Sequence, residues 1–353
     1  MENMETHERL KIAVIAFELI TPHARTGGVS HFNHRLCTKL SEWGHEITAY
    51  TMNNELENAS YRIQSLYEQK GQANRISRFY WAPFSARKVD FSAYDLVISS
   101  GDDWAMRRQG KPWVRIMHGS AWREVQHNTR MLRKINLSFQ YLLERLSFRQ
   151  SSVTLFNSND TETLYPARKQ DKVLFLPVDT KLFYPGEKAS VPTILFVGAL
   201  DSRKRGRMLR DLFVASIRKR IPDARLWMVC HPGEPLDGVE YFEHLSNEAL
   251  ADLYRKAHVY CMPSTYEGFG LPYLEALASG TLAVSTPNPG ANEVLQNGKY
   301  GVVVPDSQLA DAIADALLNY GDYKDKIADG LQRASDCSWE NVVPHYLSYG
   351  RRQ

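Results

Sequence analysis

The sequence predicts an α/β protein of two similar domains, each a doubly wound parallel sheet, that face a ligand cleft. Three observations support this prediction. Short apolar runs alternate with helical apolar patterns along the chain, as in parallel α/β folds. The alternation restarts after a segment with three prolines, at residues 177–193. The length of 353 residues corresponds to about two domains.

The first domain is expected over residues 1–185. It opens with the apolar run 12–17, which is typical of a strand buried on both faces. A helical pattern follows and ends at Gly44, a plausible C-cap; it is formed by Phe32, Leu36, Leu40 and Trp43. Further strands are predicted at 45–51, 96–99, 114–117 and 153–156.

The second domain is expected over residues 186–337, and it repeats the same alternation. Its first strand is predicted at 194–198, directly after the proline-containing segment. The helices are predicted at 206–220, 247–256, 272–279 and 309–319. The remaining strands are predicted at 226–230, 258–262 and 282–285.

Composition and charge exclude several other classes of protein. Charged residues make up 24% and hydrophobic residues 43% of the chain, which is ordinary for a globular protein. A net charge of +3 is too small for a dedicated nucleic-acid binder, so no nucleic-acid partner is expected. The four cysteines have no metal-ligand spacing, and no metal or other cofactor is predicted. The N-terminal residues do not resemble a signal peptide, and no apolar run is long enough to span a membrane, so a cytoplasmic location is expected.

The most informative segment is 260–280, in which a strand, a glycine-containing loop and a helix follow one another. Free amides and the helix dipole at such a helix start bind anions. Gly268 and Gly270 would let a ligand approach the backbone closely. Glu275, about one turn inside the helix, could accept two hydrogen bonds from a ribose diol. Glu267 could meet sugar hydroxyls on the other side of a diphosphate.

This segment, EGFGLPYLEALASG, resembles the signature of the family 4 retaining glycosyltransferases of the GT-B fold, in which two Rossmann-like domains face a cleft. The resemblance spans nearly the whole chain. It includes the turn at 289–293, the linker residues Asp179, Phe183 and Pro185, and the segment Ser338-Trp339-Glu340. It implies that Glu267 acts in catalysis and that residues 338–353 cross back to the first domain. It also implies donor-binding roles for Gly268, Phe269, Gly270, Leu271 and Glu275.

A second phosphate-binding loop is predicted at 198–206, directly after a strand. The resembling family usually has an arginine after the first glycine, Gly198, and a lysine before the second one. This chain has Ala199 and Arg205 there, so one expected phosphate contact is missing. Arg203, Lys204 or Arg205 must therefore neutralise the leaving diphosphate, and the sequence does not distinguish among them.

Two sites in the first domain are implied by the resemblance alone. His118 follows the predicted strand 114–117 and is expected to contact the transferred sugar. Gly27 and Gly28 follow the first strand and are expected near the diphosphate and the acceptor. Ser158 is a weaker candidate that is also placed to cap a helix.

Residues 123–150 combine six basic and two acidic residues with a helical apolar pattern. A basic amphipathic helix of this kind could lie on an anionic membrane surface, at the inner face of the membrane. The favoured interpretation is instead that its apolar residues pack in the core, with a solvated basic face.

The sequence predicts a retaining glycosyltransferase that moves a sugar from a nucleoside-diphosphate donor, UDP- or GDP-linked, to a hydroxyl acceptor and forms an α-glycoside. The acceptor could be a polysaccharide intermediate, a lipid or a small natural product. A nucleotide-sugar epimerase or hydrolase and a non-catalytic sugar-nucleotide-binding protein are the alternatives. A phosphorylase of the glycogen type would need a pyridoxal-phosphate lysine and a longer chain.

Overall fold

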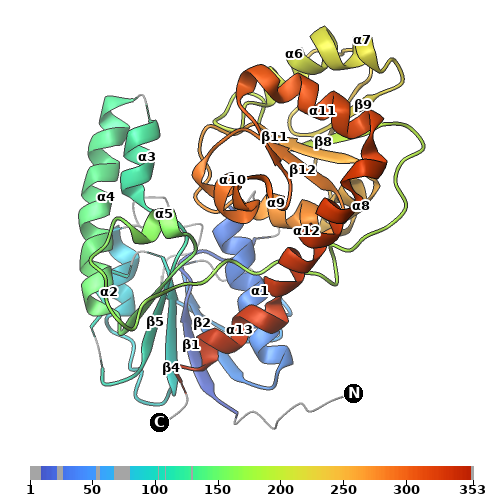
Figure 1. Cartoon of the computed structure of the whole chain (residues 1–353). Coiled ribbons are helices and arrows are strands. Elements are labelled where there is room, and N and C mark those ends of the chain that lie inside the picture. Colours follow the sequence, from blue (N-terminus) through green and yellow to red (C-terminus); the bar gives the residue numbers. More distant parts are fainter. Residues whose placement is uncertain are drawn as a thin grey trace. The chain divides into compact units, whose positions relative to one another are not determined.

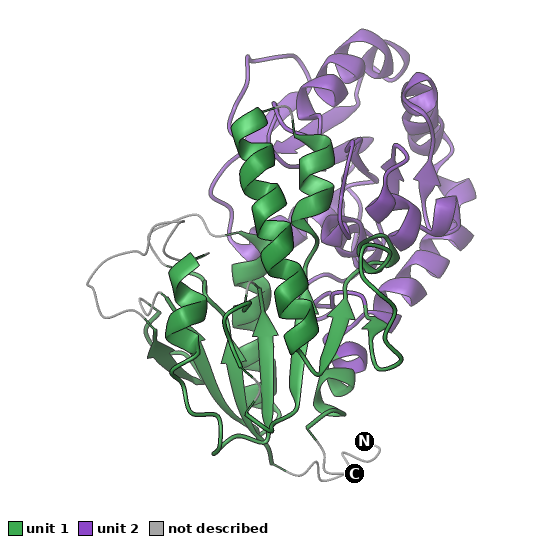
Figure 2. Ribbon diagram, turned by 90° about the vertical axis from the view of Figure 1, so that its left-hand side faces the viewer, with its two compact units in different colours: residues 1–174, 343–353 green, residues 175–342 purple. Residues whose placement is uncertain are grey.

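The computed structural model describes residues 9–21, 27–52, 56–66, 80–101, 103–107, 109–128 and 130–350. The chain divides into two compact units, residues 1–174 with 343–353 (unit 1) and residues 175–342 (unit 2). Figure 2 colours them separately. The division between Leu174 and Phe175 lies before the boundary expected at 185.

Unit 1 contains a parallel sheet of seven strands in the order β3-β2-β1-β4-β5-β6-β7. Its central strands are buried on both faces, as the apolar run at 12–17 predicts. The strands are β1 (Lys11–Ile15), β2 (Glu46–Thr51), β3 (Arg62–Ser65), β4 (Leu96–Ser100), β5 (Trp113–Met117), β6 (Val153–Phe156) and β7 (Lys172–Val173). The helices are α1 (Gly28–Glu42), α2 (Ala82–Ala86), α3 (Ala121–His127), α4 (Met131–Gln150) and α5 (Asn159–Glu162).

Unit 2 contains a second parallel sheet, in the order β10-β9-β8-β11-β12-β13. The strands are β8 (Thr193–Val197), β9 (Arg225–Val229), β10 (Val239–Phe242), β11 (Val259–Met262), β12 (Leu282–Ser285) and β13 (Val302–Val303). The α-helices are α6 (Gly206–Leu212), α7 (Arg218–Arg220), α8 (Asn247–Lys256), α9 (Leu271–Ala278), α10 (Pro289–Val294), α11 (Leu309–Leu318) and α12 (Lys324–Asp336). The predicted helix 206–220 contains a π-helical turn, Phe213–Ile217, between α6 and α7.

The last helix, α13 (Trp339–Leu347), begins in unit 2 and ends among the residues of unit 1. Figure 1 shows it following α12 at the red end of the chain. Near its end, Gly350 lies against Leu10 and Leu96 of unit 1, where an added Cβ would be 3.1 Å from Leu96 Cβ.

The expectation that the apolar side of 123–150 packs in the core is wrong. The segment forms two helices, α3 and α4, and most of the apolar residues that predicted core packing face solvent. The side of α4 that packs inward mixes apolar and polar residues: Leu137, Gln140, Leu143, Glu144, Ser147 and Phe148. No helix among the described residues is both long and apolar enough to cross a bilayer.

Candidate functional site

The sheet of unit 2 has a switch point between β8 and β11. The chain moves outward from β8 to β10 on one side and from β11 to β13 on the other. At such a point the loops that follow the two central strands separate and leave a crevice at their carboxyl ends, where ligands of α/β proteins bind. The loops here are residues 198–205 and 263–270, and they contain most of the site residues predicted in this unit.

The loop 263–270 leads into the start of α9. Gly270 is the N-cap and has a φ of 90° and a ψ of 50°. Only glycine fits well, because a Cβ would lie 2.6 Å from the ring of Tyr273. Within the described part of the chain, the amides of Gly268, Phe269 and Gly270 donate no hydrogen bond to a protein acceptor. Together with the positive end of the α9 dipole, these amides can bind an anion.

Glu267 is held rigidly within this loop. Its side chain is buried, and Ser264 Oγ donates a hydrogen bond to Oε1 at 3.0 Å. Arg203 Nη2 donates to Oε2 at 3.1 Å, while Arg203 Nε donates to the carbonyl of Tyr266 at 2.8 Å. The carboxylate therefore has a fixed position and is joined to the basic loop 198–205.

Lys204, the next basic residue of that loop, interacts electrostatically with both predicted acids. Burial lowers its pKa, with Arg203 acting in the same direction, while Glu267 and Glu275 oppose the change. Its Nζ donates to the carbonyl of Val197 at 3.2 Å. The lysine stem crosses Gly198, where an added Cβ would lie 2.6 Å from Lys204 Cδ. This contact explains the glycine at 198.

Arg205 has a different environment, because its side chain connects the loop 198–205 to other segments of unit 2. Its guanidinium binds both carboxylate oxygens of Asp306, at 2.6 and 2.7 Å, and lowers the pKa of Asp306. It also donates to Thr286 Oγ1 at 3.0 Å and to the carbonyl of Pro263 at 2.5 Å. Its backbone is left-handed, with a φ of 54°. Because its donors are directed at protein acceptors outside the two predicted acids, Arg205 is suited to a structural role. Arg203 and Lys204 are the cations of this loop that interact with Glu267.

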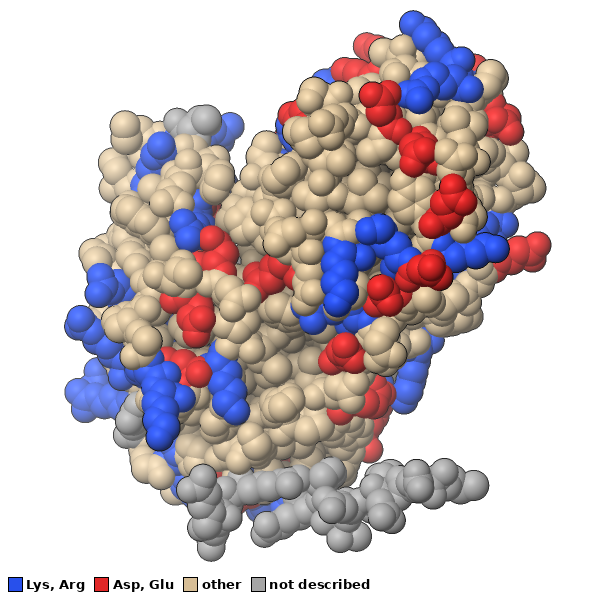
Figure 3. Space-filling view, viewed as in Figure 1, with Lys and Arg blue, Asp and Glu red and all other residues tan. Residues whose placement is uncertain are grey.

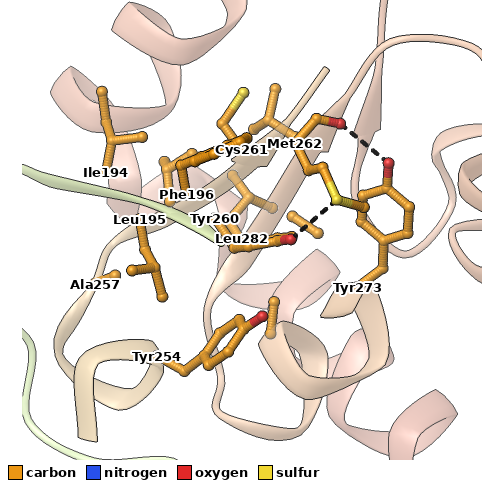
Figure 4. Close-up of a cluster of buried hydrophobic side chains, with 14 of the residues drawn as sticks. Ile194, Leu195, Phe196, Tyr254, Ala257, Tyr260, Cys261, Met262, Tyr273 and Leu282 are labelled. Atoms are coloured by element: carbon orange, nitrogen blue, oxygen red, sulfur yellow. Dashed lines mark hydrogen bonds between the residues drawn. The ribbon is translucent and has the colours of Figure 1, made fainter. Parts of the chain in front are cut away.

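Glu275 lies on α9 beside a group of buried tyrosines that the sequence analysis did not identify. Burial raises the pKa of Tyr254 well above its usual value, and the neighbouring Tyr260 and Glu275 raise it further. Figure 4 shows Tyr254, Tyr260 and Tyr273 among apolar side chains of the core. Tyr273 donates to the carbonyl of Met262 at 3.0 Å, and Tyr260 donates to its sulfur at 3.3 Å. Glu275 itself is half-buried, so part of its surface is accessible to a ligand.

The start of α10, which follows β12, supports the loop that carries Glu267. The amide of Gly290 donates to the carbonyl of Glu267 at 2.9 Å. A Cβ on Gly290 would lie 2.5 Å from the carbonyl oxygen of Phe269. Asn288 caps α10 and donates from Nδ2 to the carbonyl of Ser264 at 3.2 Å. The glycine of the predicted turn at 289–293 is therefore required by close packing against the site loop.

In unit 1, Gly27 and Gly28 lie at the start of α1. Gly27 is the N-cap, and its carbonyl accepts hydrogen bonds from the amides of Ser30 and His31. Neither glycine has a positive φ, and a Cβ on either would meet no atom of the described residues within 4 Å. Neither the backbone conformation nor the protein packing requires glycine at these two positions. Because neither residue has a side chain, there is open space beside the backbone at the start of α1.

His118 follows β5 and is held by two neighbours in unit 1. Its Nε2 lies 2.6 Å from Ser100 Oγ, and its ring packs edge-on against Phe32 at a centroid distance of 4.8 Å. Burial, with a smaller effect of Arg115, lowers the pKa of His118 to about 4. The imidazole is therefore neutral near pH 7 and can offer a hydrogen bond without a charge. The weaker candidate Ser158 caps α5, where its Oγ accepts from the amide of Thr161 at 3.2 Å.

A buried ionic cluster beneath His118 was missed by the sequence analysis. Arg115 Nε lies 3.3 Å from Asp103 Oδ1, and both side chains are almost fully buried. Glu144 accepts hydrogen bonds from Ser120 Oγ and Tyr165 Oη, each at 3.0 Å. The available signal was an arginine inside the apolar strand WVRIM, because a buried charge requires a partner.

No cluster of three or more His, Cys, Asp or Glu side chains in the described ranges is arranged as a metal site. The site residues predicted in unit 2 thus lie at the carboxyl ends of the central strands of its sheet. Among them, Arg205 has a structural role. Those predicted in unit 1, Gly27, Gly28 and His118, lie at the corresponding edge of the other sheet.

Comparison with known proteins finds a family match in the second half of the chain. Residues 191–320 match the family model "Glycosyl transferases group 1". A probable sucrose-phosphate synthase of Thermosipho melanesiensis is 28% identical over 225 residues, which cover 57% of this chain and 50% of that protein. The chain spans about half the length of the curated relatives that it matches.

Solved structures show the same fold over nearly the whole chain. A sucrose-phosphate synthase from Thermosynechococcus elongatus has a TM-score of 0.79 at 20% identity, covering 96% of this chain and 97% of that one. HepE from Anabaena, solved in complex with UDP and glucose, has a TM-score of 0.70 at 14% identity, covering 96% and 98%. Residues 191–320 are therefore similar to the group 1 glycosyltransferases, and the fold of the chain is that of the GT-B glycosyltransferases.

Proposed function

We propose that the protein transfers a sugar from a nucleoside-diphosphate donor to a hydroxyl acceptor. The observation that carries this proposal is the switch point of unit 2. There, the loops after β8 and β11 and the start of α9 carry three amides that have no protein acceptor among the described residues. They also carry the cations Lys204 and Arg203 and the acids Glu267 and Glu275. A diphosphate requires amides and cations, and the hydroxyls of a ribose and a sugar require acceptors.

In the proposed complex, the diphosphate lies on the amides of residues 268–270 at the start of α9. Lys204 and Arg203 neutralise its charge. Glu275 accepts hydrogen bonds from the ribose diol, and Glu267 accepts them from the sugar. The match to HepE, whose structure contains UDP and glucose, supports a donor of this kind. We propose UDP- or GDP-sugar as the donor.

The proposed reaction retains the anomeric configuration and produces an α-glycoside. The acceptor oxygen forms a bond to the anomeric carbon on the face from which the diphosphate leaves, and the bond between that carbon and the phosphate oxygen breaks. The acceptor proton passes to the departing diphosphate. The protein contributes positioning and stabilisation of the growing negative charge. Since Ala199 supplies no charge, we assign this stabilisation to Lys204, to Arg203 and to the α9 amides.

Unit 1 is proposed to supply contacts to the sugar and to the acceptor. The neutral His118, fixed by Ser100, would offer a ring nitrogen to a sugar hydroxyl. Gly27 and Gly28 would let the diphosphate or acceptor approach the start of α1. The acceptor is proposed to be a polysaccharide intermediate, a lipid or a small natural product, used on the cytoplasmic side of a membrane or in the cytoplasm.

A thermal-shift screen with UDP, GDP, ADP and TDP tests the donor site first. A ligand that binds only the folded state raises the melting temperature by mass action. We expect one of these nucleotides to stabilise the wild type, and Glu275→Ala to lose most of that shift. Glu267→Gln should retain nucleotide binding and lose mainly turnover. Unchanged nucleotide binding by Glu275→Ala would remove the ribose assignment.

Turnover separates transfer from the two alternative functions. With donor and acceptor present, the proposal predicts release of the nucleoside diphosphate and an α-linked product, identified by the NMR coupling of its anomeric proton. Free sugar or an isomerised donor in the absence of acceptor would indicate a hydrolase or an epimerase. Binding without turnover for each acceptor class would indicate a sugar-nucleotide sensor.

A further inference from the structure

The outer side of α4 is an apolar surface that faces solvent. Six large apolar side chains on this helix are at least 42% exposed: Met131, Leu132, Ile135, Phe139, Leu142 and Leu146. They follow a spacing of three and four residues, which places them on one side of the helix. Figure 2 views unit 1 from the side of α4, and the helix runs in front of the sheet. Water contact with so many large apolar groups on one helix is unfavourable.

The apolar surface continues onto the neighbouring helix α2. Trp81 and Phe84 are 62% and 43% exposed. Tyr80 joins the two helices, because its ring lies 6.0 Å from that of Phe139 and its hydroxyl donates to Asn136 Oδ1 at 2.6 Å. We call the six α4 residues together with Trp81 and Phe84 the α4 face. Two helices thus contribute to one surface, and the surface includes a tryptophan, a side chain favoured at membrane interfaces.

Basic side chains border the α4 face, and no exposed acid lies on α4 itself. Arg145 and Arg149 follow Leu142 and Leu146 by three residues, so each lies beside an apolar member of the face. The helix also carries Arg133 and Lys134. Its one acidic residue, Glu144, is buried on the inner side. Figure 3 shows blue side chains among tan ones along the edge of unit 1 where Figure 1 places α4.

We propose that the α4 face docks unit 1 on an anionic lipid bilayer, with the apolar residues entering the interface and the basic residues contacting lipid headgroups. This combination is typical of helices that lie in the plane of a membrane. A second copy of this chain fits less well. Two identical faces in symmetric contact would bring their arginines together without acids from α4 to pair with them. The inference is independent of the proposed function, since vesicle binding and donor binding are measured separately.

Flotation of the full-length protein with vesicles tests the proposal. Vesicles of equal parts phosphatidylglycerol and phosphatidylcholine should capture the protein at low salt, and vesicles of phosphatidylcholine alone should capture far less. Raising the salt concentration should weaken binding, because the headgroup contacts are screened. Failure to bind the anionic vesicles would overturn the proposal.

A matched pair of substitutions assigns the binding to the α4 face. Leu142→Glu and the control Leu318→Glu, on α11 of unit 2, alter leucines that are 58% and 60% exposed. Both variants should fold with melting temperatures near that of the wild type, which is measured first. Leu142→Glu should reduce vesicle affinity on the order of tenfold, and Leu318→Glu should not. Equal effects of the two variants would contradict the assignment.

Two further experiments distinguish the contribution of charge to vesicle binding from that of apolar contact, and test whether the protein self-associates. Replacing Arg145 and Arg149 by glutamine should reduce binding to anionic vesicles and remove much of its salt dependence. Sedimentation of the free protein should show no self-association that depends on Leu142. A dimer that dissociates on Leu142→Glu would assign the α4 face to a second copy and overturn the membrane proposal.

Discussion

The amide of Gly290 donates a hydrogen bond to the carbonyl of Glu267 at 2.9 Å, so the start of α10 holds the loop that precedes α9. The same glycine leaves room for the carbonyl of Phe269, which would lie 2.5 Å from an added Cβ. The position of the Glu267 carboxylate and of the neighbouring amides thus depends on a residue that contributes no side chain.

Gly290→Ala is expected to impair donor binding. The added methyl would push against the backbone of Phe269 and against the Glu267 Cβ, at 2.9 Å, and neither is a flexible side-chain end. We expect a loss of about 1–3 kcal/mol in the free energy of unfolding, as for overpacking in a core. The nucleotide-induced thermal shift should fall as well. Gly321→Ala is the control, because a Cβ there meets no atom within 4 Å. Similar results for both variants would show that the site loop does not depend on Gly290.

Arg205 should contribute mainly to the stability of the fold, and Lys204 mainly to diphosphate binding. Arg205→Ala removes hydrogen bonds to three partners, Pro263, Thr286 and Asp306, and should reduce the free energy of unfolding by about 1–3 kcal/mol. Lys204→Met keeps most of the stem over Gly198 and should leave stability nearly unchanged, while diphosphate affinity falls at least about tenfold. Urea unfolding and nucleotide titration of both variants distinguish these effects. Greater loss of nucleotide binding in folded Arg205→Ala than in Lys204→Met would reverse the assignment.

Much of the fold followed from the sequence because buried parallel strands are short apolar runs. The runs at 194–198, 258–262 and 282–285 correspond to β8, β11 and β12, and the Glu267 to Glu275 segment lies between the last two, as predicted. The edge strands β3, β7, β10 and β13 were missed because they are only partly buried and lack such a run. The hydrophobic pattern of the sequence cannot predict a strand of two residues, because such a strand forms only by pairing within the tertiary fold.

The roles of individual side chains were less predictable. The sequence did not distinguish Arg203, Lys204 and Arg205, because the choice depends on Asp306, about a hundred residues later in the chain. It also misassigned the apolar side of α4, because an apolar helical stripe has the same pattern whether it meets a core or a solvent-exposed surface. Arg115 interacts with the buried acids Asp103 and Glu144, which belong to other segments of the chain. The sequence alone gives no signal that these three residues lie close together.

Stability should decrease in mild acid because of His118. Its pKa is lowered to about 4 in the folded protein, whereas a histidine in the unfolded chain has a pKa of about 6.5. Unfolding therefore takes up a proton between these values, and the free energy of unfolding falls as the pH drops through this window. The contribution reaches up to about 2 kcal/mol between pH 7 and pH 5. Urea unfolding of wild type and His118→Asn at both pH values checks this, since the variant should lack this part of the decrease. The same decrease in both proteins would show that His118 is not responsible.

Asp103→Ala should be strongly destabilising. The substitution leaves Arg115 buried beside an empty position, and uncompensated buried charges cost about 3–5 kcal/mol. The control Asp237→Ala removes the exposed partner of Arg218 and should cost at most about 1 kcal/mol. Denaturant unfolding measures both. A small effect of Asp103→Ala would mean that Glu144 alone compensates the Arg115 charge.

Hydrogen–deuterium exchange of the full-length protein, with and without the nucleoside diphosphate that stabilises it most, tests the central claim most directly. A diphosphate on the α9 amides would slow exchange in peptides covering 263–275 and 198–205, and peptides from α12 should exchange as before. Bound nucleotide that leaves both loops exchanging at unchanged rates, while another part of the chain is protected, would contradict the claim.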